Sequence, residues 1–564
     1  MEINDFVHSI QGKPLNEANE TIEKICGVAD FFETEAYEIT KTTAQESKVE
    51  YGDWQTNLDL AIRICNLLKN QGVKPDVVIE PTCGTGTFII ASMIVFGDSL
   101  SEIYGIEIYK PYINQLKHRI LEYALKKTDT CKCRICLIHQ NVFDFDFDNL
   151  HIDKNKNILI LGNPPWVTNS KLCEINSNNL PQKSNFKKMK GLDAITGRAN
   201  FDIAETITYR LLDKFHRQPS CLAFLMKNSV AKNIVSEQRY GRFCISDMAQ
   251  YNIDSKKEFD VSVAASLFVA KLNGGQARLC TVLDLYGLSP LYSYGWVGDS
   301  FVSNVQNYLQ CSEIDGKSQL TWWSGMKHDC SKVMELEKRD GRLYNKLGEE
   351  VAIEPDLIYP ILKSSDIKGG HIDTSRKYVI VTQKKVSDDT AAIGHLYPLT
   401  YKYLNDHSKW FDARGSIIYR SRPKFCIFGI GSYSFQKYKI AIGGLNKNTS
   451  FSLVQPIGDK CVMLDDTCYF LGFDDYETAQ CVLKILNSNV VQNFIQSLVF
   501  SDAKRSINKD LLMRIDLRKA ATTLLKENYI TDEEYETVEN ITSSLRHFNK
   551  SSELTLPLFD VSSL

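Results

Sequence analysis

The sequence predicts an α/β protein whose first half forms a mostly parallel sheet and whose C-terminal part forms an α+β domain. Short apolar runs without polar alternation, typical of buried parallel strands, alternate with helical periodicity between residues 58 and 161. Each of these runs ends at a glycine-rich, acidic or proline-rich segment. After residue 346, short aromatic and β-branched runs give way to helical spacing, which indicates a separate mixed domain.

The length and composition fit a large globular protein. A chain of 564 residues exceeds a single core, so about two to four domains are expected. The apolar fraction of 43% and the charged fraction of 24% exclude a disordered or collagen-like chain. The N-terminus has no apolar stretch of signal-peptide length and no run is long enough to cross a membrane. We therefore expect a cytoplasmic protein whose 16 cysteines stay reduced.

The expected elements follow one another as strand and helix in alternation. The first 50 residues form an N-terminal helical extension, with apolar positions at Ile22, Ile25, Val28 and Phe32. The sheet domain spans residues 51–285, a connector without a clean period spans 286–345, and the C-terminal domain spans 346–564. We expect helices over 58–69 and 111–126 and one that begins near residue 88, and strands over 76–80, 103–106, 135–140, 157–161, 222–226 and 262–271.

A glycine-containing loop joins the strand over 76–80 to the helix that begins near residue 88. Its sequence, Glu80-Pro-Thr-Cys-Gly-Thr-Gly-Thr87, has small residues where backbone can approach a ligand closely. It lacks the Lys-Ser/Thr ending of a P-loop and the full G-x-G-x-x-G of a dinucleotide site. Glu107 ends the next strand, where an acid is well placed to bind a ribose diol. A tight turn and a surface glutamate would produce the same pattern.

A second segment, Gly162-Asn163-Pro164-Pro165-Trp166, follows the strand over 157–161. The two prolines hold the chain extended, so an amide, a main-chain carbonyl and an aromatic face are displayed at the strand end. Two acceptors and an aromatic surface are the groups that bind an exocyclic amine on a ring. The alternative is an ordinary proline turn with a packed tryptophan. The neighbouring glycine loop and acidic strand end favour a binding site.

Three cysteines and a histidine offer four metal-binding side chains. Cys131, Cys133, Cys136 and His139 have the spacing C-x-C-x2-C-x2-H, which is not a common zinc pattern. Cys136 also leads into an apolar run that is typical of a strand. We therefore expect ordinary thiols and no bound metal.

On these residues the chain resembles the S-adenosylmethionine-dependent N6-adenine DNA methyltransferases of restriction–modification systems. Glu80–Phe88 is similar to the cofactor loop of that family, Glu107 to its ribose-binding acid, and Gly162–Trp166 to its catalytic motif in the tryptophan form. The motif order, with target recognition at the C-terminus, resembles that of the TaqI-type members. The resemblance covers roughly residues 50–272 and implies a Rossmann-like mixed sheet. Weaker similarity runs through 451–466 and 501–516.

The resemblance also implies which residues hold S-adenosylmethionine. The segment Tyr51–Asn57 is similar to the one that closes over the methionine end, although many relatives have proline where this chain has Asn57. The group that holds the cofactor's adenine amine has two candidates, Asn141 and Asp144. The full cofactor-binding set is Thr56, Glu80, Pro81, Thr82, Cys83, Gly84, Gly86, Glu107, Ile108, Asn141, Asp144 and Asn163.

The mechanism that the resemblance implies is alignment of two substrates. A target adenine leaves the duplex and stacks against Trp166 and Phe259. The side chain of Asn163 and the carbonyl of Pro164 accept hydrogen bonds from its N6 amine, and Pro165 and Trp166 complete the catalytic motif. Similarity continues at Asn200-Phe201-Asp202. Neither a covalent intermediate nor a metal nor a strong general base is required.

The near-neutral total charge of −3 hides a basic stretch. Residues 363–447 contain 15 Lys or Arg and six Asp or Glu, and aromatic residues interleave with the cations. A solvated surface is the simpler interpretation of a charge run. Beside a domain that methylates adenine, the stretch instead indicates contact with double-stranded DNA. The candidate DNA-binding residues are Arg414, Arg420, Arg422 and Lys424.

The sequence therefore predicts a site-specific DNA adenine-N6 methyltransferase, the modification enzyme of a restriction–modification system. We expect a monomer without cleavage activity, and a cognate restriction endonuclease, if the system has one, would be encoded separately. An RNA adenine methyltransferase is the closest alternative. A protein glutamine methyltransferase shares the catalytic motif but needs no large basic domain. A non-catalytic binding module would leave the Asn-Pro-Pro-Trp motif unexplained.

Overall fold

The computed structural model describes residues 3–10, 12–29, 56–126, 133–168, 202–420, 422–445, 448–500 and 505–550. The chain divides into two compact units, Met1–Phe301 and Val302–Leu564. The boundary lies within residues 286–345, for which the sequence predicts a connector. Residues 290–302 join the sheet of the first unit, whereas the strands from Trp323 onward belong to the second.

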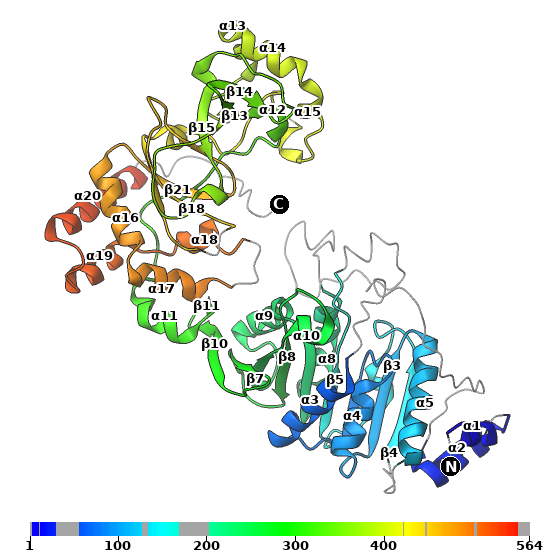
Figure 1. The fold of residues 1–564 in the computed structure, drawn as a ribbon. Coiled ribbons are helices and arrows are strands. Elements are labelled where there is room, and N and C mark those ends of the chain that lie inside the picture. The colour runs from blue at the N-terminus through cyan, green and yellow to red at the C-terminus, as the bar shows by residue number, and fades with distance from the viewer. Residues whose placement is uncertain are drawn as a thin grey trace. The chain divides into compact units, whose positions relative to one another are not determined.

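An 11-stranded mixed sheet forms the centre of the first unit (Figure 1). Its strand order is β1-β4-β3-β2-β5-β6-β8-β7-β9-β10-β11. All neighbours from β1 to β6 in this order are parallel, whereas β8 runs antiparallel to both β6 and β7. The strands are β1 (Val28–Ala29), β2 (Val77–Glu80), β3 (Glu102–Glu107), β4 (Cys133–His139), β5 (Ile158–Gly162), β6 (Ser220–Lys227), β7 (Ile245–Asn252), β8 (Ala265–Leu272), β9 (Leu279–Asp284), β10 (Pro290–Val297) and β11 (Ser300–Val302).

Helices cover both faces of this sheet.

The predicted elements of the sheet domain are present in the structure. The six predicted strands are confirmed as β2, β3, β4, β5, β6 and β8, and the predicted helices are confirmed as α3, α4 and α5. The first-unit helices are α1 (Ile3–Ile10), α2 (Leu15–Cys26), α3 (Leu58–Asn70), α4 (Thr87–Phe96), α5 (Lys110–Lys126), α8 (Ile203–Phe215), α9 (Asn228–Ser236) and α10 (Ser255–Phe259), with 3-10 turns η1 (Phe147–Leu150) and η2 (Glu237–Tyr240).

The N-terminal extension is only partly helical. Helix α2 ends at Cys26 because Gly27 adopts a left-handed conformation with φ +70°. Val28, predicted to continue the helix, instead begins β1 and pairs with β4. The predicted position Phe32 lies outside the described residues. A helical period read across a glycine therefore overestimated the length of this helix.

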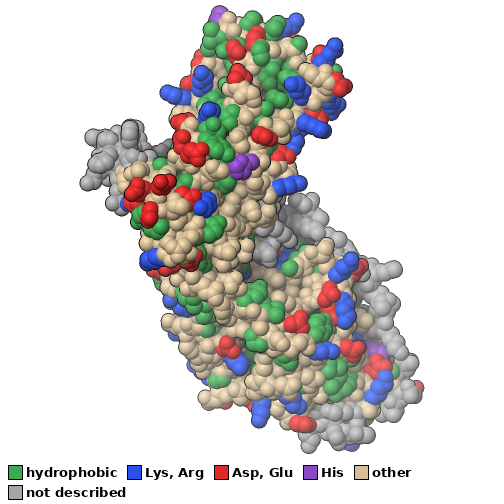
Figure 2. Space-filling view, turned by 60° about the vertical axis from the view of Figure 1, so that its left-hand side comes forward, with side chains coloured by type: hydrophobic (Ala, Val, Ile, Leu, Met, Phe, Trp, Pro, Cys, Tyr) green, Lys and Arg blue, Asp and Glu red, His purple; other side chains and the backbone are tan. Residues whose placement is uncertain are grey.

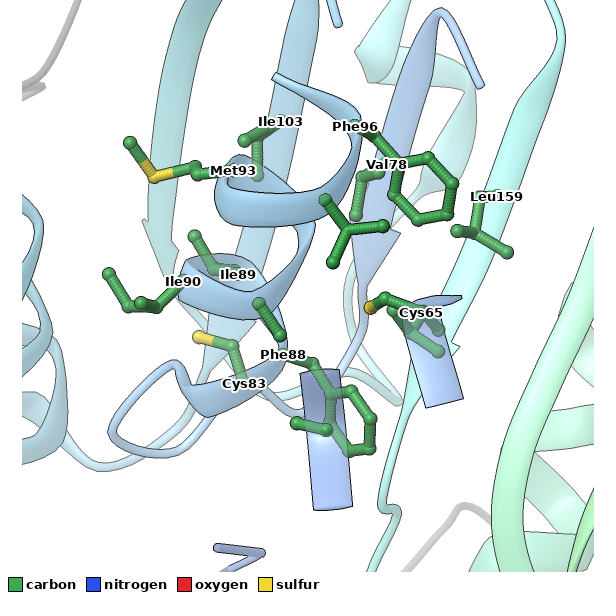
Figure 3. Packing of buried hydrophobic residues seen from close by; sticks show 14 of the residues in the cluster. Cys65, Val78, Cys83, Phe88, Ile89, Ile90, Met93, Phe96, Ile103 and Leu159 are labelled. Carbon is green, nitrogen blue, oxygen red and sulfur yellow. The ribbon is translucent and has the colours of Figure 1, made fainter. Parts of the chain in front are cut away.

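The main core lies between the sheet and helices α3, α4 and α5. The cluster joins Phe88, Ile89 and Met93 of α4 to Val78 and Ile103 of the sheet. Figure 3 shows Phe96 of α4 near Val78 and Leu159. Nine of the ten residues of α4 are buried, which explains why its sequence is apolar on every side. Each such fully buried side chain contributes about 1.5–3 kcal/mol of transfer free energy. Helices α8 and α9 contribute nothing to this cluster and pack on the opposite face.

The strand order creates a crevice at one edge of the sheet. Strand β2 pairs with β3 on one side and with β5 on the other, so the chain direction across the sheet reverses between β2 and β5. Ligands of open α/β sheets bind beyond the carboxyl ends of the strands at this point. The glycine loop follows β2 and the Asn-Pro-Pro-Trp segment follows β5, so both predicted ligand-binding segments lie at this crevice.

The second unit contains two five-stranded sheets, in the orders β12-β21-β18-β19-β16 and β14-β13-β17-β15-β20. Their strands are β12 (Trp323–Ser324), β13 (Glu335–Arg339), β14 (Arg342–Asn345), β15 (Ile358–Leu362), β16 (Gly370–Ile372), β17 (Lys377–Ile380), β18 (Tyr438–Gly443), β19 (Ser452–Val454), β20 (Met463–Leu464) and β21 (Cys468–Phe473). The helices are α11 (Val305–Cys311), α12 (Ser331–Met334), α13 (Ile393–Leu396), α14 (Pro398–Asp406), α15 (Ser408–Asp412), α16 (Tyr476–Leu486), α17 (Asn489–Leu498), α18 (Lys509–Leu512), α19 (Leu517–Lys526) and α20 (Asp532–Lys550). Among the described helices of the whole chain, none is long and apolar enough to cross a membrane.

Candidate active site

A pocket of about 800 Å³ opens at the crevice between β2 and β5. This volume includes solvent at the open mouth of the pocket. Ten of the twelve predicted cofactor residues line it; Gly86 and Asp144 do not. The lining residues are Thr56, Glu80, Pro81, Thr82, Cys83, Gly84, Thr87, Phe88, Glu107, Ile108, Tyr112, Gln140, Asn141, Val142, Phe143, Asn163, Pro165, Ile203 and Ile207.

The glycine loop bends tightly over the start of α4. Gly84 and Gly86 have φ values of +51° and +76°, a region that disfavours side chains. A Cβ atom on Gly86 would also lie 1.9 Å from a methyl group of Leu116. Arg119 of α5 holds the turn, because its guanidinium donates to the Thr85 carbonyl at 2.6 Å and to the Thr85 hydroxyl at 3.0 Å. Gly86 therefore shapes the loop without lining the pocket.

Glu80 places a buried carboxyl group at the end of β2. Its side chain is 3% exposed, and its Oε2 atom has no hydrogen-bond partner among the described residues. Burial raises the pKa of Glu80 well above its usual range, and the nearby Glu107 carboxylate raises it further. A hydrogen bond from the Ile89 backbone and the charge of Arg119 oppose this shift. An acid held in this way will accept a cation or hydrogen-bond donor that enters the pocket.

Glu107 ends β3 on the opposite side of the glycine loop. Its Oε2 accepts from the Gly84 backbone at 2.8 Å, and its Oε1 accepts from the Tyr109 backbone at 2.9 Å. These bonds fix the orientation of the carboxylate. The side chain is 8% exposed and lines the pocket. Glu107 therefore borders the pocket as a fixed carboxylate, and its role in binding a ribose diol stays a prediction.

The structure separates the two candidates that follow β4. Asn141 lines the pocket, and its Oδ1 accepts from the Phe143 backbone at 3.0 Å. Asp144 is not among the lining residues, and the side chain of Arg210 lies near it and donates to the Phe143 and Phe145 carbonyls. Asn141 is therefore the candidate that can reach a ligand in this pocket.

The Asn-Pro-Pro-Trp segment forms the other wall. Asn163 donates through Nδ2 to the Thr56 hydroxyl at 3.2 Å, and Pro165 lines the pocket. Trp166 is buried, and its indole N–H donates to the Leu225 carbonyl at 3.2 Å, which fixes the ring. Asp202, also singled out by the sequence, caps α8 and pairs with Lys227 at 2.6 Å. Residues Tyr51 to Gln55, Asn200 and Phe201 lie outside the described residues.

Trp166 and Phe259 contact each other directly. Their ring centroids are 5.2 Å apart with an interplanar angle of 67°, an edge-to-face arrangement. A base stacked between the two rings would need about 7 Å, twice the usual carbon contact distance. For a base to stack between Trp166 and Phe259, as the sequence predicts, the Phe259 ring must therefore move away from Trp166. The role of both residues in base stacking stays a prediction.

The two described cysteines of the predicted cluster lie on opposite faces of one strand. Cys133 and Cys136 both lie in β4, three positions apart, so their side chains point to opposite faces of the sheet. His139 ends the strand, where its Nε2 lies 3.0 Å from the Ile108 carbonyl. Cys131 lies outside the described residues. The two described cysteines of the cluster cannot share one metal ion.

In the second unit, part of the basic stretch is used internally. Arg414 donates to the Phe411, Lys424 and Cys426 carbonyls and stacks on the Tyr419 ring at 3.8 Å. It therefore organises the loop, and its contact with DNA stays a prediction. Lys439 is 1% exposed and donates to the Gln436 carbonyl. These two cations contribute little to an outward-facing surface.

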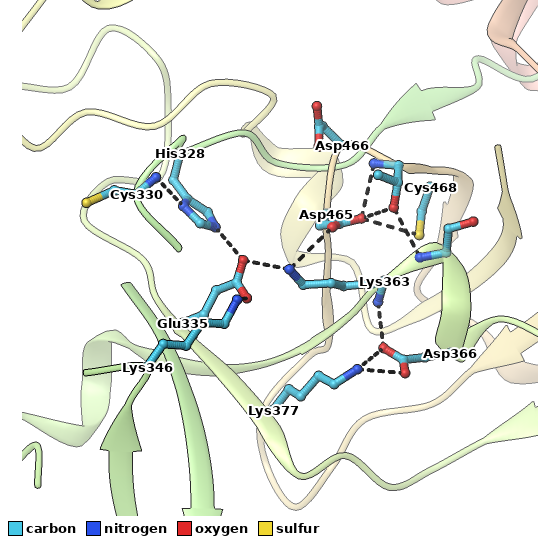
Figure 4. A network of polar contacts seen from close by, with 12 residues as sticks. His328, Cys330, Glu335, Lys346, Lys363, Asp366, Lys377, Asp465, Asp466 and Cys468 are labelled. Carbon is cyan, nitrogen blue, oxygen red and sulfur yellow. Dashed lines mark hydrogen bonds and ion pairs between the residues drawn. The ribbon is translucent and has the colours of Figure 1, made fainter. Parts of the chain in front are cut away.

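Lys363 also forms ion pairs within the second unit, as part of a network of polar contacts (Figure 4). Its Nζ lies 2.7 Å from Glu335 and 3.9 Å from Asp465, and Lys346 pairs with the other Glu335 oxygen at 2.7 Å. Burial alone would raise the pKa of Glu335, but hydrogen bonds from His328, Lys346 and Lys363 hold it well below its usual range. The charge count of the stretch thus overstates its free positive charge.

Arg420, Arg422 and Lys424 remain exposed. Lys424 forms an exposed ion pair with Asp412 at 3.3 Å, whereas no side-chain ion pair of Arg420 or Arg422 occurs among the described residues. They follow a 3-10 turn, η7 (Ile417–Tyr419), that is anchored by the buried Tyr419. Figure 2 shows Lys and Arg side chains gathered in the upper part of the second unit, the end that carries α13, α14 and α15 in Figure 1.

Comparisons with known proteins match this arrangement. Residues 359–516 match the family described as the TaqI-like C-terminal specificity domain, a range that includes all four predicted DNA-binding residues. The chain is 39% identical over 483 residues to Type II methyltransferase M.NspV of Nostoc sp., which covers 85% of this chain and 99% of the relative. Among solved structures it resembles the type IIL restriction–modification enzyme MmeI in complex with DNA, with a TM-score of 0.51 and 11% identity over 92% of this chain and 78% of that chain.

Proposed function

The chain belongs to the type II DNA methyltransferases of restriction–modification systems, and on that premise we propose that it transfers the methyl group of S-adenosylmethionine to the N6 amine of an adenine flipped out of duplex DNA. One observation carries the proposal. The Asn163 amide and the Pro164-Pro165-Trp166 segment follow β5 at the same crevice where Glu80 and Glu107 line a pocket. An amine-binding wall and a cofactor pocket thus adjoin each other.

The residues of the pocket fit S-adenosylmethionine. Buried oxygens of Glu80 and Thr82 have no hydrogen-bond partner among the described residues, which favours a ligand that brings donors or positive charge. S-adenosylmethionine has an ammonium group, ribose hydroxyls and an adenine amine. We assign Glu80 to the cationic methionine end, Glu107 to the ribose and Asn141 to the adenine amine. When bound, the cofactor supplies an activated methyl group on a positively charged sulfur.

The chemistry needs an amine with an available lone pair. The Asn163 carbonyl oxygen and the Pro164 main-chain carbonyl would each accept one N–H of the target amine, which localises the nitrogen lone pair toward the methyl group. Trp166, fixed by its bond to Leu225, would hold the ring of the base by stacking. The proton can leave after methyl transfer, so no strong general base is required.

A labelled-methyl assay tests the proposed function. Unmethylated plasmid DNA is incubated with the protein and methyl-labelled S-adenosylmethionine, beside RNA and protein substrates, and the DNA is digested to nucleosides. We expect the label in N6-methyldeoxyadenosine at one recognition sequence, which long-read sequencing of the same DNA identifies. Label in methylcytosine, or only in RNA or protein, would contradict the proposal.

Arg420 and Arg422 are expected to contact DNA phosphates. The double substitution Arg420→Ala, Arg422→Ala should weaken binding to target and non-target duplexes alike, because phosphate contacts are independent of sequence. Each lost contact lowers the slope of log affinity against log salt by about 1, so a decrease of about 2 is expected in salt-dependent binding measurements.

Arg414→Ala is the matched control for these arginines. It removes a cation from the same loop, but one that bonds to main-chain carbonyls. It should lower the melting temperature and leave the salt slope nearly unchanged, because the carbonyls lose their donors. An unchanged slope in the double variant would remove Arg420 and Arg422 from the DNA-binding surface.

Other properties of the enzyme stay expectations. Because its proposed substrate is cellular DNA, the enzyme would act in the cytoplasm. A separately encoded endonuclease with the same recognition sequence would be its functional counterpart, and a monomer suffices because the first unit contains a complete proposed site.

A further inference from the structure

The carboxylate of Glu258 links two parts of the first unit that lie far apart in the sequence. Its Oε2 accepts from the Asn57 side-chain amide at 2.9 Å, and its Oε1 accepts from the Tyr286 hydroxyl at 2.5 Å. Asn57 precedes α3, Glu258 lies in α10, and Tyr286 lies in the turn between β9 and β10. We refer to Asn57, Glu258 and Tyr286 as the Glu258 bridge.

The Asn57 end of the bridge is tied to the catalytic amide. Asn57 caps α3, because its Oδ1 accepts from the Leu60 backbone at 2.7 Å, so both ends of its amide are occupied. The preceding residue, Thr56, is buried and accepts from Asn163 at 3.2 Å. A displacement of Asn57 would therefore move Thr56, and with it the hydrogen bond that orients Asn163.

The Glu258 end is tied to the aromatic ring that must move. Glu258 immediately precedes Phe259, which ends α10 and packs against Trp166. Helix α10 has only five residues, and the chain leaves it through Asp260 with φ +55°. So short a helix is held in place mainly by its contacts with other segments. The bridge supplies two such contacts next to Phe259.

The Tyr286 end is itself fixed by cations. Arg63 of α3 lies over the Tyr286 ring at 5.2 Å, and Lys257 lies near it at 5.4 Å. Together with the Asn57 bond, this arrangement connects α3 to α10 by two routes. The contacts form a closed path: Asn163 to Thr56, Asn57 to Glu258, and Phe259 back to Trp166, three residues after Asn163.

We propose that Glu258 is a positioning residue that couples the Thr56–Asn57 segment, which orients Asn163, to Phe259, which must shift when the target base enters. The inference rests on the proposed function and deepens it. Through the Glu258 bridge, the placement of the flipped base and the orientation of the Asn163 amide depend on each other. Loss of the bridge then impairs the bound-base geometry and leaves the cofactor pocket itself intact, because none of its three residues lines that pocket.

The test is a double-mutant cycle of Asn57→Ser and Glu258→Ala. Serine keeps the helix cap but is too short to reach Glu258. Each single variant should lower kcat about fivefold to twentyfold with KM for S-adenosylmethionine changed less than twofold, and the double variant should be no worse than the single ones. A duplex with 2-aminopurine at the target adenine should show a smaller fluorescence increase on binding in all three. Glu258→Gln, which keeps one acceptor, should recover part of both signals.

Glu237→Ala is the matched control. Glu237 is a partly exposed acid of the same unit, paired with Arg242 at 3.0 Å, and its loss should change neither kcat nor the 2-aminopurine signal. If the wild type methylates adenine and the bridge variants behave like Glu237→Ala, or if their effects are additive, the coupling is refuted while the proposed function stands. If the wild type transfers no methyl group to adenine, the proposed function fails and this inference fails with it.

Discussion

Asn163→Ala is expected to lower kcat for methyl transfer about 10²–10³-fold, the usual cost of removing one preorganised hydrogen-bonding group from an active site. The Asn163 oxygen is the side-chain acceptor proposed for the target amine, so alanine removes one of the two acceptors and leaves the Pro164 carbonyl. The affinity for S-adenosylmethionine should change little, because the main polar contacts proposed for the cofactor come from Glu80, Glu107 and Asn141. Product formation with labelled cofactor and calorimetric titration of the cofactor measure the two quantities separately.

Two further substitutions sharpen this prediction. Asn163→Asp keeps an acceptor oxygen in a side chain of the same size, so it should retain more activity than Asn163→Ala. Asn157→Ala removes an asparagine just before the same strand, where it bonds to Asp76 at 3.1 Å far from the pocket, and should keep wild-type activity. An Asn163→Ala variant as active as Asn157→Ala would exclude Asn163 from the mechanism.

The part of the fold that could be predicted is the part built from strands buried on both faces. Strand β2, with all four residues buried, and β5, with all five buried, appear in the sequence as continuous apolar runs that end at a polar loop. Strand β7 was missed because buried and exposed residues mix along it, and β10 because three of its first residues are exposed. Strands with such patterns do not differ from irregular segments in a single sequence.

The site was predictable where chemistry requires a particular residue type. Glu80, Glu107 and Asn163 could be found because polar side chains and glycines follow buried strands. Ile203 and Ile207 also line the pocket, but apolar helix residues read as ordinary core. The internal bonds of Arg414 could not be predicted, because a charge run does not indicate which cations bond to main-chain carbonyls within their own loop. In both cases the partners are ones that only the folded chain provides.

Glu80→Gln is expected to weaken S-adenosylmethionine binding about 10- to 100-fold, since hydrogen bonds to charged groups contribute about 1.5–3 kcal/mol. The same change should stabilise the ligand-free protein. Burial raises the pKa of Glu80 in the folded chain. The contribution of this carboxyl group to the stability of the fold is therefore fully present below its unfolded pKa, and it is lost as the pH rises through the folded pKa. The melting temperature of the variant, relative to the wild type, should therefore increase as pH rises from about 4.5 through neutrality.

Glu102→Gln provides a control of opposite sign. Glu102 begins β3, and although partial burial favours its neutral form, hydrogen bonds from Lys156 and Tyr104 lower its pKa. The contribution of the Glu102 carboxylate to the stability of the fold is present above its unfolded pKa and disappears as the pH falls through its folded pKa. Glu102→Gln should therefore destabilise the protein at neutral pH. Cofactor affinity should not change, because Glu102 lies at the far end of the strand from the pocket. Melting curves between pH 5 and 8, with and without S-adenosylmethionine, distinguish the two acids. If Glu80→Gln bound the cofactor as tightly as the wild type, the buried carboxyl group would have no role in holding its cationic end.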